Sequence, residues 1–179
     1  SDRNDPRRSE RPILLSFLKF IFYRFADCLV LQTNKIKQNY SFLEKKKIVV
    51  IPNTISEKIF FKDNYKLQKF IKIISVGRLE YQKGYDILLN TLNLLNNKKI
   101  KFICDIYGIG SEKKKINEKI KDFKLNKKVN IKGVRKDILK IYKKYDLFIL
   151  SSRFEGYPNS LLEAMSSGLV SISSNCDYG

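Results

Sequence analysis

Residues 147–172 read LFILSSRFEGYPNSLLEAMSSGLVSI, and this stretch contains a strand, a loop, a helix and a second strand in succession. The apolar run Leu147–Leu150 predicts a buried strand, and Pro158-Asn159 is a helix start signal. Helical spacing over Ser160–Ser167 and an apolar run over Leu169–Ile172 complete the unit. Strands joined through a helix in one sheet run parallel, so the stretch predicts an α/β fold with a parallel sheet.

The same alternation of strands and helices occupies the chain from residue 70 onward. Strands are predicted at Ile71–Val76, Phe102–Tyr107 and Val129–Ile131, and helices at Tyr85–Leu95, Glu112–Phe123 and Asp137–Tyr145. Glycines come soon after four of these five strands, at Gly77, Gly108, Gly110, Gly133 and Gly156. In an open parallel sheet, ligands bind at the carboxyl ends of the strands. The glycine-containing loops therefore predict the rim of a site.

The first 76 residues contain no glycine and have a different organisation. The sequence predicts a helix over residues 12–27, a strand at Leu29–Gln32, a helix over 34–43 and a strand at Ile48–Ile51. The polar stretch Ser56–Lys69 predicts a linker. We therefore divide the chain into residues 1–65, the end of one domain with its linker, and residues 66–179, a second domain.

The composition removes several kinds of chemistry. The chain has 36 basic and 18 acidic residues, a formal charge of +18, and no histidine. The missing histidine excludes Ser-His-Asp triads, His-ligated zinc and imidazole acid–base catalysis. The charge is spread over both parts of the chain, which favours a solvated lysine-rich surface over a nucleic-acid interface. An anionic membrane surface would tolerate the same charge.

The most apolar stretch of the chain, residues 13–26, does not predict a transmembrane helix. It is interrupted by Lys19 and Arg24 and falls short of an uninterrupted membrane span. A core or domain-interface helix is the favoured interpretation, and a helix lying in a membrane surface is the alternative. The widely spaced Cys28, Cys104 and Cys176 form no metal or redox motif and fit a reducing compartment. We expect a cytoplasmic protein, or one peripheral on the cytoplasmic face of the membrane.

Residues 77–84, GRLEYQKG, follow a predicted strand and precede a predicted helix. They place Arg78 and Lys83 at the mouth of the sheet, next to a helix N-terminus. Arginine can bind two phosphate oxygens at once, and lysine adds a mobile positive charge. Free N–H groups and the helix dipole also favour an anion there. An ordinary basic surface turn is an equally good interpretation of the spacing alone.

A second group of residues combines two carboxylates with a predicted helix start. Glu155 lies on the loop after Leu150, and Glu163 lies close to the start of the next helix. Helix capping would explain Glu163 but not Glu155. Gly108-Ile109-Gly110 is a weak signal, because the third glycine of a nicotinamide-binding fingerprint is absent. Asp105 lies within an apolar strand and is interpreted as structural, and no Asp-x-Asp pair suggests a metal site.

These elements together resemble the donor-binding half of the GT-B retaining glycosyltransferases of family 4. The resemblance rests on Arg78 with Lys83-Gly84, the Gly108–Gly110 turn and the Glu155–Glu163 block, in the order of the family. Residues 49–54, VVIPNT, are similar to the inter-domain element, and the match covers about residues 26–175. Residues 1–6 resemble a segment of bacterial surface-glycan members. One departure is Val170-Ser171, near the position where the family usually has Pro-Val.

The resemblance implies a fold, a reaction and a set of roles. The fold is Rossmann-like, a parallel sheet with helices on both faces that forms the C-terminal half of a GT-B enzyme, preceded by the tail of an α/β domain. Arg78 and Lys83 would stabilise the departing diphosphate, and Glu155 would hold the transferred sugar. Further donor contacts are implied for Gly77, Gly133, Val134, Gly156, Asn159, Ser160, Leu161 and Glu163, with Glu163 on the ribose and the residue 133–135 loop near the base.

The resemblance also implies the reaction partners. The enzyme would transfer a hexosyl or N-acetylhexosaminyl group, with retention and without a metal or other cofactor, from a nucleotide-diphosphate sugar. A UDP-sugar is the favoured donor, and a glycan or a polyprenyl-linked glycan is the acceptor. Because the acceptor is bound mainly by the preceding domain, the 179-residue chain is expected to be inactive alone. Two alternatives stay open: another GT-B activity, such as an epimerase or phosphorylase, and a non-catalytic module that binds polyanions or membranes.

Overall fold

The computed structural model describes residues 13–40, 43, 47–55, 60–61 and 69–176, which form two compact units. The larger unit contains Ile55–Arg153 and Asn159–Asn175. The smaller unit contains Ser1–Thr54, Phe154–Pro158 and Cys176–Gly179. Most of the linker predicted at Ser56–Lys69 lies outside the described residues.

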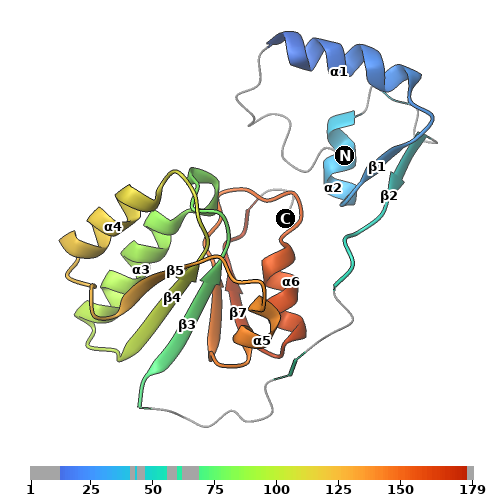
Figure 1. Ribbon diagram of the computed structural model, residues 1–179. Helices are drawn as coiled ribbons and strands as arrows, with labels where there is room; N and C mark the ends of the chain where they lie inside the picture. The colour runs from blue at the N-terminus through green and yellow to red at the C-terminus, as the bar shows by residue number, and fades with distance from the viewer. Residues whose placement is uncertain (1–12, 41–42, 44–46, 56–59, 62–68, 177–179) are drawn as a thin grey trace. The chain divides into compact units, whose positions relative to one another are not determined.

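The larger unit is built on a parallel sheet of five strands in the order β5-β4-β3-β6-β7 (Figure 1). The strands are β3 (Ile71–Val76), β4 (Phe102–Tyr107), β5 (Val129–Gly133), β6 (Leu147–Leu150) and β7 (Val170–Ser173). The prediction of a parallel sheet is confirmed. From the central β3 the chain proceeds outward through β4 and β5. It then crosses to the other side of β3, where β6 pairs with β3 and β7 pairs with β6. The strand order therefore reverses between β3 and β6, the position at which open α/β sheets bind ligands.

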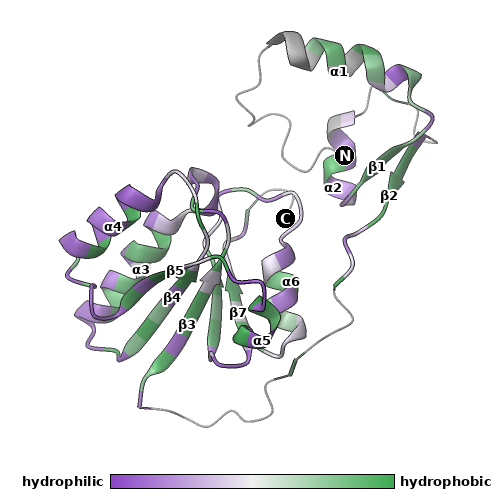
Figure 2. Ribbon diagram, in the orientation of Figure 1, coloured by the Kyte–Doolittle hydropathy of each residue, from purple (hydrophilic) through white to green (hydrophobic). Residues whose placement is uncertain are grey.

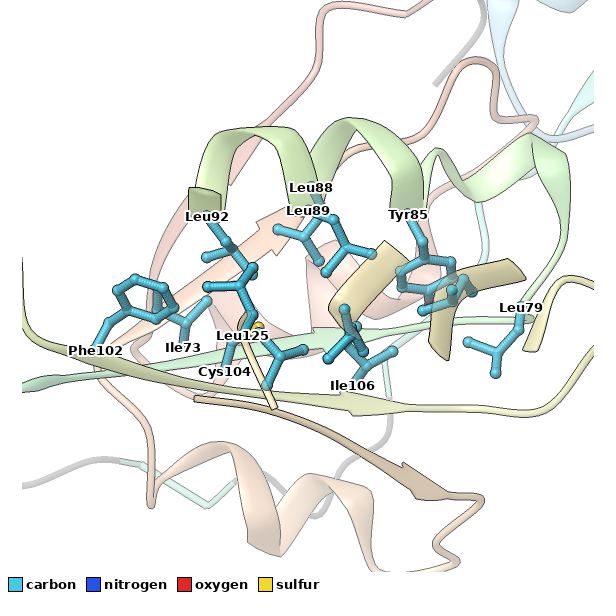
Figure 3. Packing of buried hydrophobic residues seen from close by; sticks show 13 residues of the cluster. Ile73, Leu79, Tyr85, Leu88, Leu89, Leu92, Phe102, Cys104, Ile106 and Leu125 are labelled. Carbon is cyan, nitrogen blue, oxygen red and sulfur yellow. The ribbon is translucent and has the colours of Figure 1, made fainter. Parts of the chain in front are cut away.

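Helices cover both faces of this sheet, as predicted. They are α3 (Tyr85–Asn97), α4 (Lys113–Asp122), α5 (Ile138–Tyr142) and α6 (Asn159–Ser166), with a 3-10 turn η3 (Tyr81–Lys83) before α3. The buried residues Tyr85, Leu88, Leu89 and Leu92 form the apolar stripe of α3. They pack against β3 and β4 on one face of the sheet (Figure 3). A second cluster, which includes Tyr142, Phe148 and Ala164, fills the other face beneath α5 and α6.

The alternation of burial along the strands explains why both faces are filled. In β4, Phe102, Cys104 and Ile106 are buried on the α3–α4 side, and the residues between them face the other side. In Figure 2 the strands are mainly hydrophobic (green), whereas α4 is mainly hydrophilic (purple). Asp105 accepts hydrogen bonds from Asn130 and from the Tyr145 hydroxyl (both 2.7 Å). These contacts agree with its interpretation as a structural residue.

One helix and one strand have ends that differ from the sequence prediction. α5 ends at Tyr142 rather than at Tyr145, because Lys144 and Tyr145 donate to carbonyls three residues back and tighten the chain into a turn. The last strand begins at Val170, because the Leu169 N–H closes the preceding helix by donating to Ala164 O (3.1 Å). The 3-10 turn η3 was not predicted at all.

The smaller unit pairs two short parallel strands, β1 (Leu29–Leu31) and β2 (Ile48–Val50). It also contains α1 (Ile13–Phe25), α2 (Asn34–Lys37) and the 3-10 turn η1 (Gln38–Tyr40). The prediction of one helix over 34–43 is wrong, because the α-helix ends at Lys37 and the chain continues as 3-10 turn. Ile36 and Tyr40 still pack with Leu31 in a small core. Within the described part of the chain, no helix is long and apolar enough to cross a membrane.

Candidate active site

A cavity of about 180 Å³ lies at the carboxyl ends of β3, β4 and β5. Of the predicted site residues, Gly77, Arg78 and Val134 line it directly. Gly133 is adjacent to Val134 and ends β5 with a φ of +72°, a conformation that favours glycine. The complete lining is Val76, Gly77, Arg78, Tyr107, Gly108, Ile109, Val134, Arg135 and Ile138.

The aliphatic part of the Lys83 side chain lies next to Gly77, which lines the cavity. A Cβ atom placed on Gly77 would lie 3.1 Å from Lys83 Cε and 3.2 Å from Lys83 Cδ, so the lysine side chain passes across Gly77. The Tyr85 hydroxyl donates to Gly77 O (3.0 Å), and Arg78 Nη2 donates to the side chain of Gln82 (3.1 Å). The two predicted cations therefore lie together where β3 ends.

The Gly108-Ile109-Gly110 turn has a structural explanation. A Cβ on Gly108 would lie 1.9 Å from Gly77 O, and one on Gly110 would lie 2.4 Å from Leu79 O. The Leu79 N–H donates to Ile109 O (2.9 Å), which joins the two loops further. These glycines let the loop after β4 pack directly on the backbone of the loop after β3. The weak sequence signal thus marks close packing beside the cavity.

Glu163 lies farther into its helix than the sequence indicated. Because α6 begins at Asn159, Glu163 is outside the first turn, and the alternative that it caps the helix is wrong. Its carboxylate Oε2 accepts a hydrogen bond from the Tyr142 hydroxyl (3.2 Å), which also lies 3.3 Å from Ser160 O. Burial raises the pKa of Glu163, and the hydrogen bond from Tyr142 opposes this shift.

Two tyrosine hydroxyls connect these loops to neighbouring helices: Tyr142 of α5 donates to Ser160 O at the start of α6, and Tyr85 of α3 donates to Gly77 O after β3. Burial raises the pKa of Tyr142 most, and the charge of Glu163 and the nearby Tyr85 raise it further. Tyr85 in turn contacts Gly77, as described above. The predicted residues Asn159, Ser160 and Leu161 form the first turn of α6, where backbone N–H groups are not used within the helix.

The structure does not place every predicted residue in this group. Glu155 and Gly156 belong to Phe154–Pro158, which clusters with the smaller unit, whereas Arg78 and Lys83 belong to the larger unit. Glu155 itself is buried. Among the described residues, no group of three or more Cys, Asp or Glu side chains could hold a metal ion.

Sequence reasoning missed two residues that support the predicted ones. Tyr142 was read only as part of a helix, because its contact with Glu163 is not visible in either local pattern. Arg153 forms a bidentate ion pair with Asp86, with Nη1–Oδ1 and Nη2–Oδ2 distances of 2.8 and 2.6 Å. The two residues are 67 positions apart in the sequence, so no spacing rule connects them.

Comparison with known proteins finds relatives among the glycosyltransferases. An uncharacterized glycosyltransferase of Methanocaldococcus jannaschii, MJ1059, is 31% identical over 193 residues, which cover 99% of this chain and 48% of that protein. The amylovoran biosynthesis glycosyltransferase AmsD of Erwinia amylovora is 29% identical over 167 residues, which cover 90% of this chain and 47% of that protein. The chain thus spans about half the length of these relatives.

A solved structure shows the same fold. The pneumococcal O-GlcNAc transferase GtfA, in complex with UDP and GlcNAc, superposes with a TM-score of 0.81 at 22% identity and covers 99% of this chain and 36% of that chain. The Rossmann-like arrangement is therefore that of GT-B glycosyltransferases, as the sequence predicted. Residues 56–179 also match the family described as glycosyl transferases group 1. The chain belongs to the group 1 glycosyltransferases.

Proposed function

We propose that residues 66–179 bind the donor of a retaining family 4 glycosyltransferase, and that the donor is a nucleotide-diphosphate sugar, with a UDP-sugar favoured. The observation that carries the proposal is the position of Lys83 and Arg78 together at the end of β3, beside a cavity at the carboxyl ends of β3, β4 and β5. A pair of cations there is suited to a diphosphate. The structure of GtfA was solved with UDP, which supports this choice of base.

Each residue then has a distinct role. Arg78 and Lys83 stabilise the negative charge that grows on the diphosphate as the anomeric C–O bond breaks. The N–H groups of Asn159, Ser160 and Leu161 extend this phosphate site. Glu163 accepts hydrogen bonds from the ribose hydroxyls. Its partial burial raises the pKa of the carboxyl group, and the hydrogen bonds from the ribose would lower that pKa again.

The remaining roles concern the base and the transferred sugar. The cavity beside Gly133 and Val134 receives the base, because it is lined mainly by apolar and backbone groups. Glu155 and Gly156 hold the transferred hexosyl or N-acetylhexosaminyl group. Since Arg78 and Lys83 supply two positive charges to the diphosphate, the proposed reaction needs no metal and no cofactor.

The acceptor is proposed to be a glycan or a polyprenyl-linked glycan used in surface polysaccharide or glycoconjugate synthesis. The name of AmsD, which refers to biosynthesis of the polysaccharide amylovoran, supports this class. The relatives are about twice as long as the matched part, so we propose that transfer needs the additional residues that they contain. Family membership disfavours the alternative of a polyanion-binding module, and no nucleic-acid partner is proposed.

Isothermal calorimetry with UDP and GDP on the 179-residue chain tests the proposal. We expect UDP to bind and the chain to turn over no UDP-sugar. A double variant, Arg78→Ala with Lys83→Ala, should lose most of the affinity, because each charged hydrogen bond contributes about 1.5–3 kcal/mol. No heat of binding from either nucleotide, in a sample whose circular dichroism shows folded protein, would contradict the donor site. Sustained transfer by the chain would contradict the need for further residues.

A peripheral membrane contact is the second proposal, and α1 carries it. Its Phe17, Phe22 and Phe25 side chains are 58%, 64% and 80% exposed. Exposed aromatic residues on a helix can insert at the boundary between head groups and acyl chains. We expect the protein to float with anionic vesicles, and Phe22→Ser with Phe25→Ser to abolish flotation. If the unaltered protein stays at the bottom of the gradient, α1 is a protein interface and the membrane proposal is wrong.

A further inference from the structure

The η3 turn, which contains Lys83, is hydrogen-bonded to residues 151–153, the segment that follows β6. Three successive carbonyl groups of η3 accept hydrogen bonds from that segment. The Arg153 Nη1 donates to Tyr81 O (3.0 Å), the Arg153 N–H donates to Gln82 O (2.8 Å), and Ser151 Oγ donates to Lys83 O (3.0 Å). The position of Lys83 therefore depends on residues about 70 positions later in the chain.

The Arg153 side chain adds further contacts to this anchor, the set of hydrogen bonds from Ser151 and Arg153 to η3. Its guanidinium lies 4.1 Å from the centre of the Tyr81 ring, and the same group forms the bidentate ion pair with Asp86 in α3. Only a planar arginine fork can stack on a ring and reach a carboxylate and a carbonyl together. The Arg153 side chain is 21% exposed, so this is a partly buried arrangement rather than a loose surface ion pair.

Two observations indicate that the anchor serves the site. Arg153 contacts both ends of the segment between Tyr81 and Asp86, and Lys83 lies between them. Arg153 also stands directly before Phe154–Pro158, the segment that contains Glu155, so the same anchor fixes where that segment leaves the larger unit. The Arg153 hydrogen bond holds the pKa of Asp86 below its ordinary value, so the pair persists at neutral pH and is lost only as the pH falls through that lowered pKa.

We propose that Arg153 is a positioning residue for the diphosphate, which holds the η3 turn so that Lys83 crosses Gly77 at the rim of the cavity. The inference rests on the proposed function, since it assumes that Lys83 binds phosphate. Arg153 itself touches no substrate. Its loss should weaken diphosphate binding only through Lys83.

A double-mutant cycle on UDP binding tests this dependence. Arg153→Lys keeps the charge but loses the fork, and we expect UDP to bind about 10-fold more weakly, comparable to the loss of one hydrogen bond to a charged group. In a Lys83→Ala background, Arg153→Lys should cause no further loss, because residues that act through one another are not additive. Asp86→Asn should weaken binding in the same way as Arg153→Lys. Unchanged affinity in Arg153→Lys, or a full additional loss in the double variant, would overturn the proposal.

Amide hydrogen exchange separates this inference from the donor assignment. Peptides that cover residues 79–86 should exchange faster in Arg153→Lys and in Asp86→Asn, with or without nucleotide. If UDP does not bind even the unaltered chain but the turn still loosens, the donor site is wrong and the anchor stands as a structural device only. If exchange of residues 79–86 does not change, Arg153 does not hold the turn and the inference fails whatever the chain binds.

Discussion

Lys83→Ala is expected to lower the rate of sugar transfer by about 10²-fold or more, the effect of removing one preorganised donor to a developing negative charge. The charge on the diphosphate grows as the bond to the sugar breaks, so the lysine acts more strongly in the transition state than on the bound donor. Initial rates should be measured on a polypeptide that includes the residues that the relatives have beyond this chain. A variant that changes neither kcat nor KM would show that Lys83 has no part in the reaction.

Matched variants sharpen this result. Lys127→Ala removes the same charge from an exposed position and should leave the rate unchanged. Gly77→Ala keeps the lysine, but its methyl group would lie 3.1 Å from Lys83 Cε, so the lysine chain must shift slightly and the rate should fall less than in Lys83→Ala.

The carboxylates should respond differently from the lysine. Glu163→Gln should mainly raise the KM for the donor, because contacts to the ribose are equally strong before and during the reaction. Glu155→Gln should lower the rate more than the affinity, because the sugar gains positive charge in the transition state. Because Glu155 is not proposed as a general base, the pH dependence of the rate should be the same in Glu155→Gln as in the unaltered enzyme. Full activity in Glu155→Gln would show that its assigned role is wrong.

Gly108→Ala is expected to reduce the free energy of unfolding by about 3 kcal/mol or more, which is among the larger effects of a single substitution. The added Cβ would lie 1.9 Å from Gly77 O, and a backbone carbonyl cannot move aside as a side chain can. The loops after β3 and β4 would have to separate, which would also break the hydrogen bond from Leu79 N–H to Ile109 O. Urea unfolding followed by circular dichroism gives the measurement.

Gly133→Ala is the control for this result. Gly133 has a φ of +72°, but nothing lies within 4 Å of an added Cβ. This variant should therefore show only the cost of a left-handed conformation, about 1–2 kcal/mol. Equal losses in the two variants would mean that the loops after β3 and β4 are not packed as closely as described.

The fold was largely predictable because the signals that specify it are local. Apolar runs at residues 71–76 and 102–107 coincide with β3 and β4, since a strand buried on both faces is a continuous apolar run. The ends of elements were less predictable. The early end of α2 at Lys37 and the η3 turn depend on 3-10 hydrogen bonds, which leave no pattern of their own in the sequence.

The sequence could indicate candidate site residues only where they follow the ends of predicted strands. Arg78 and Lys83 were identified because they follow a strand, whereas Arg153 could be linked to Asp86 and Tyr81 only by pairing β3 with β6. Glu163 shows the same limit. Its partner Tyr142 comes from a different helix, and the direction in which each side chain points depends on packing beneath α5 and α6.

The hydrogen bonds between η3 and residues 151–153 also affect how the protein folds while it is being synthesised. The core formed by β3, β4, β5, α3 and α4 consists of residues that leave the ribosome before β6, and domains generally fold from the N-terminus during synthesis. The three carbonyls of the η3 turn lack their hydrogen-bond donors until Ser151 and Arg153, which follow β6, have been made. A nascent chain that stalls before residue 151 would therefore hold Lys83, the residue proposed to bind phosphate, on a turn that lacks these three hydrogen bonds.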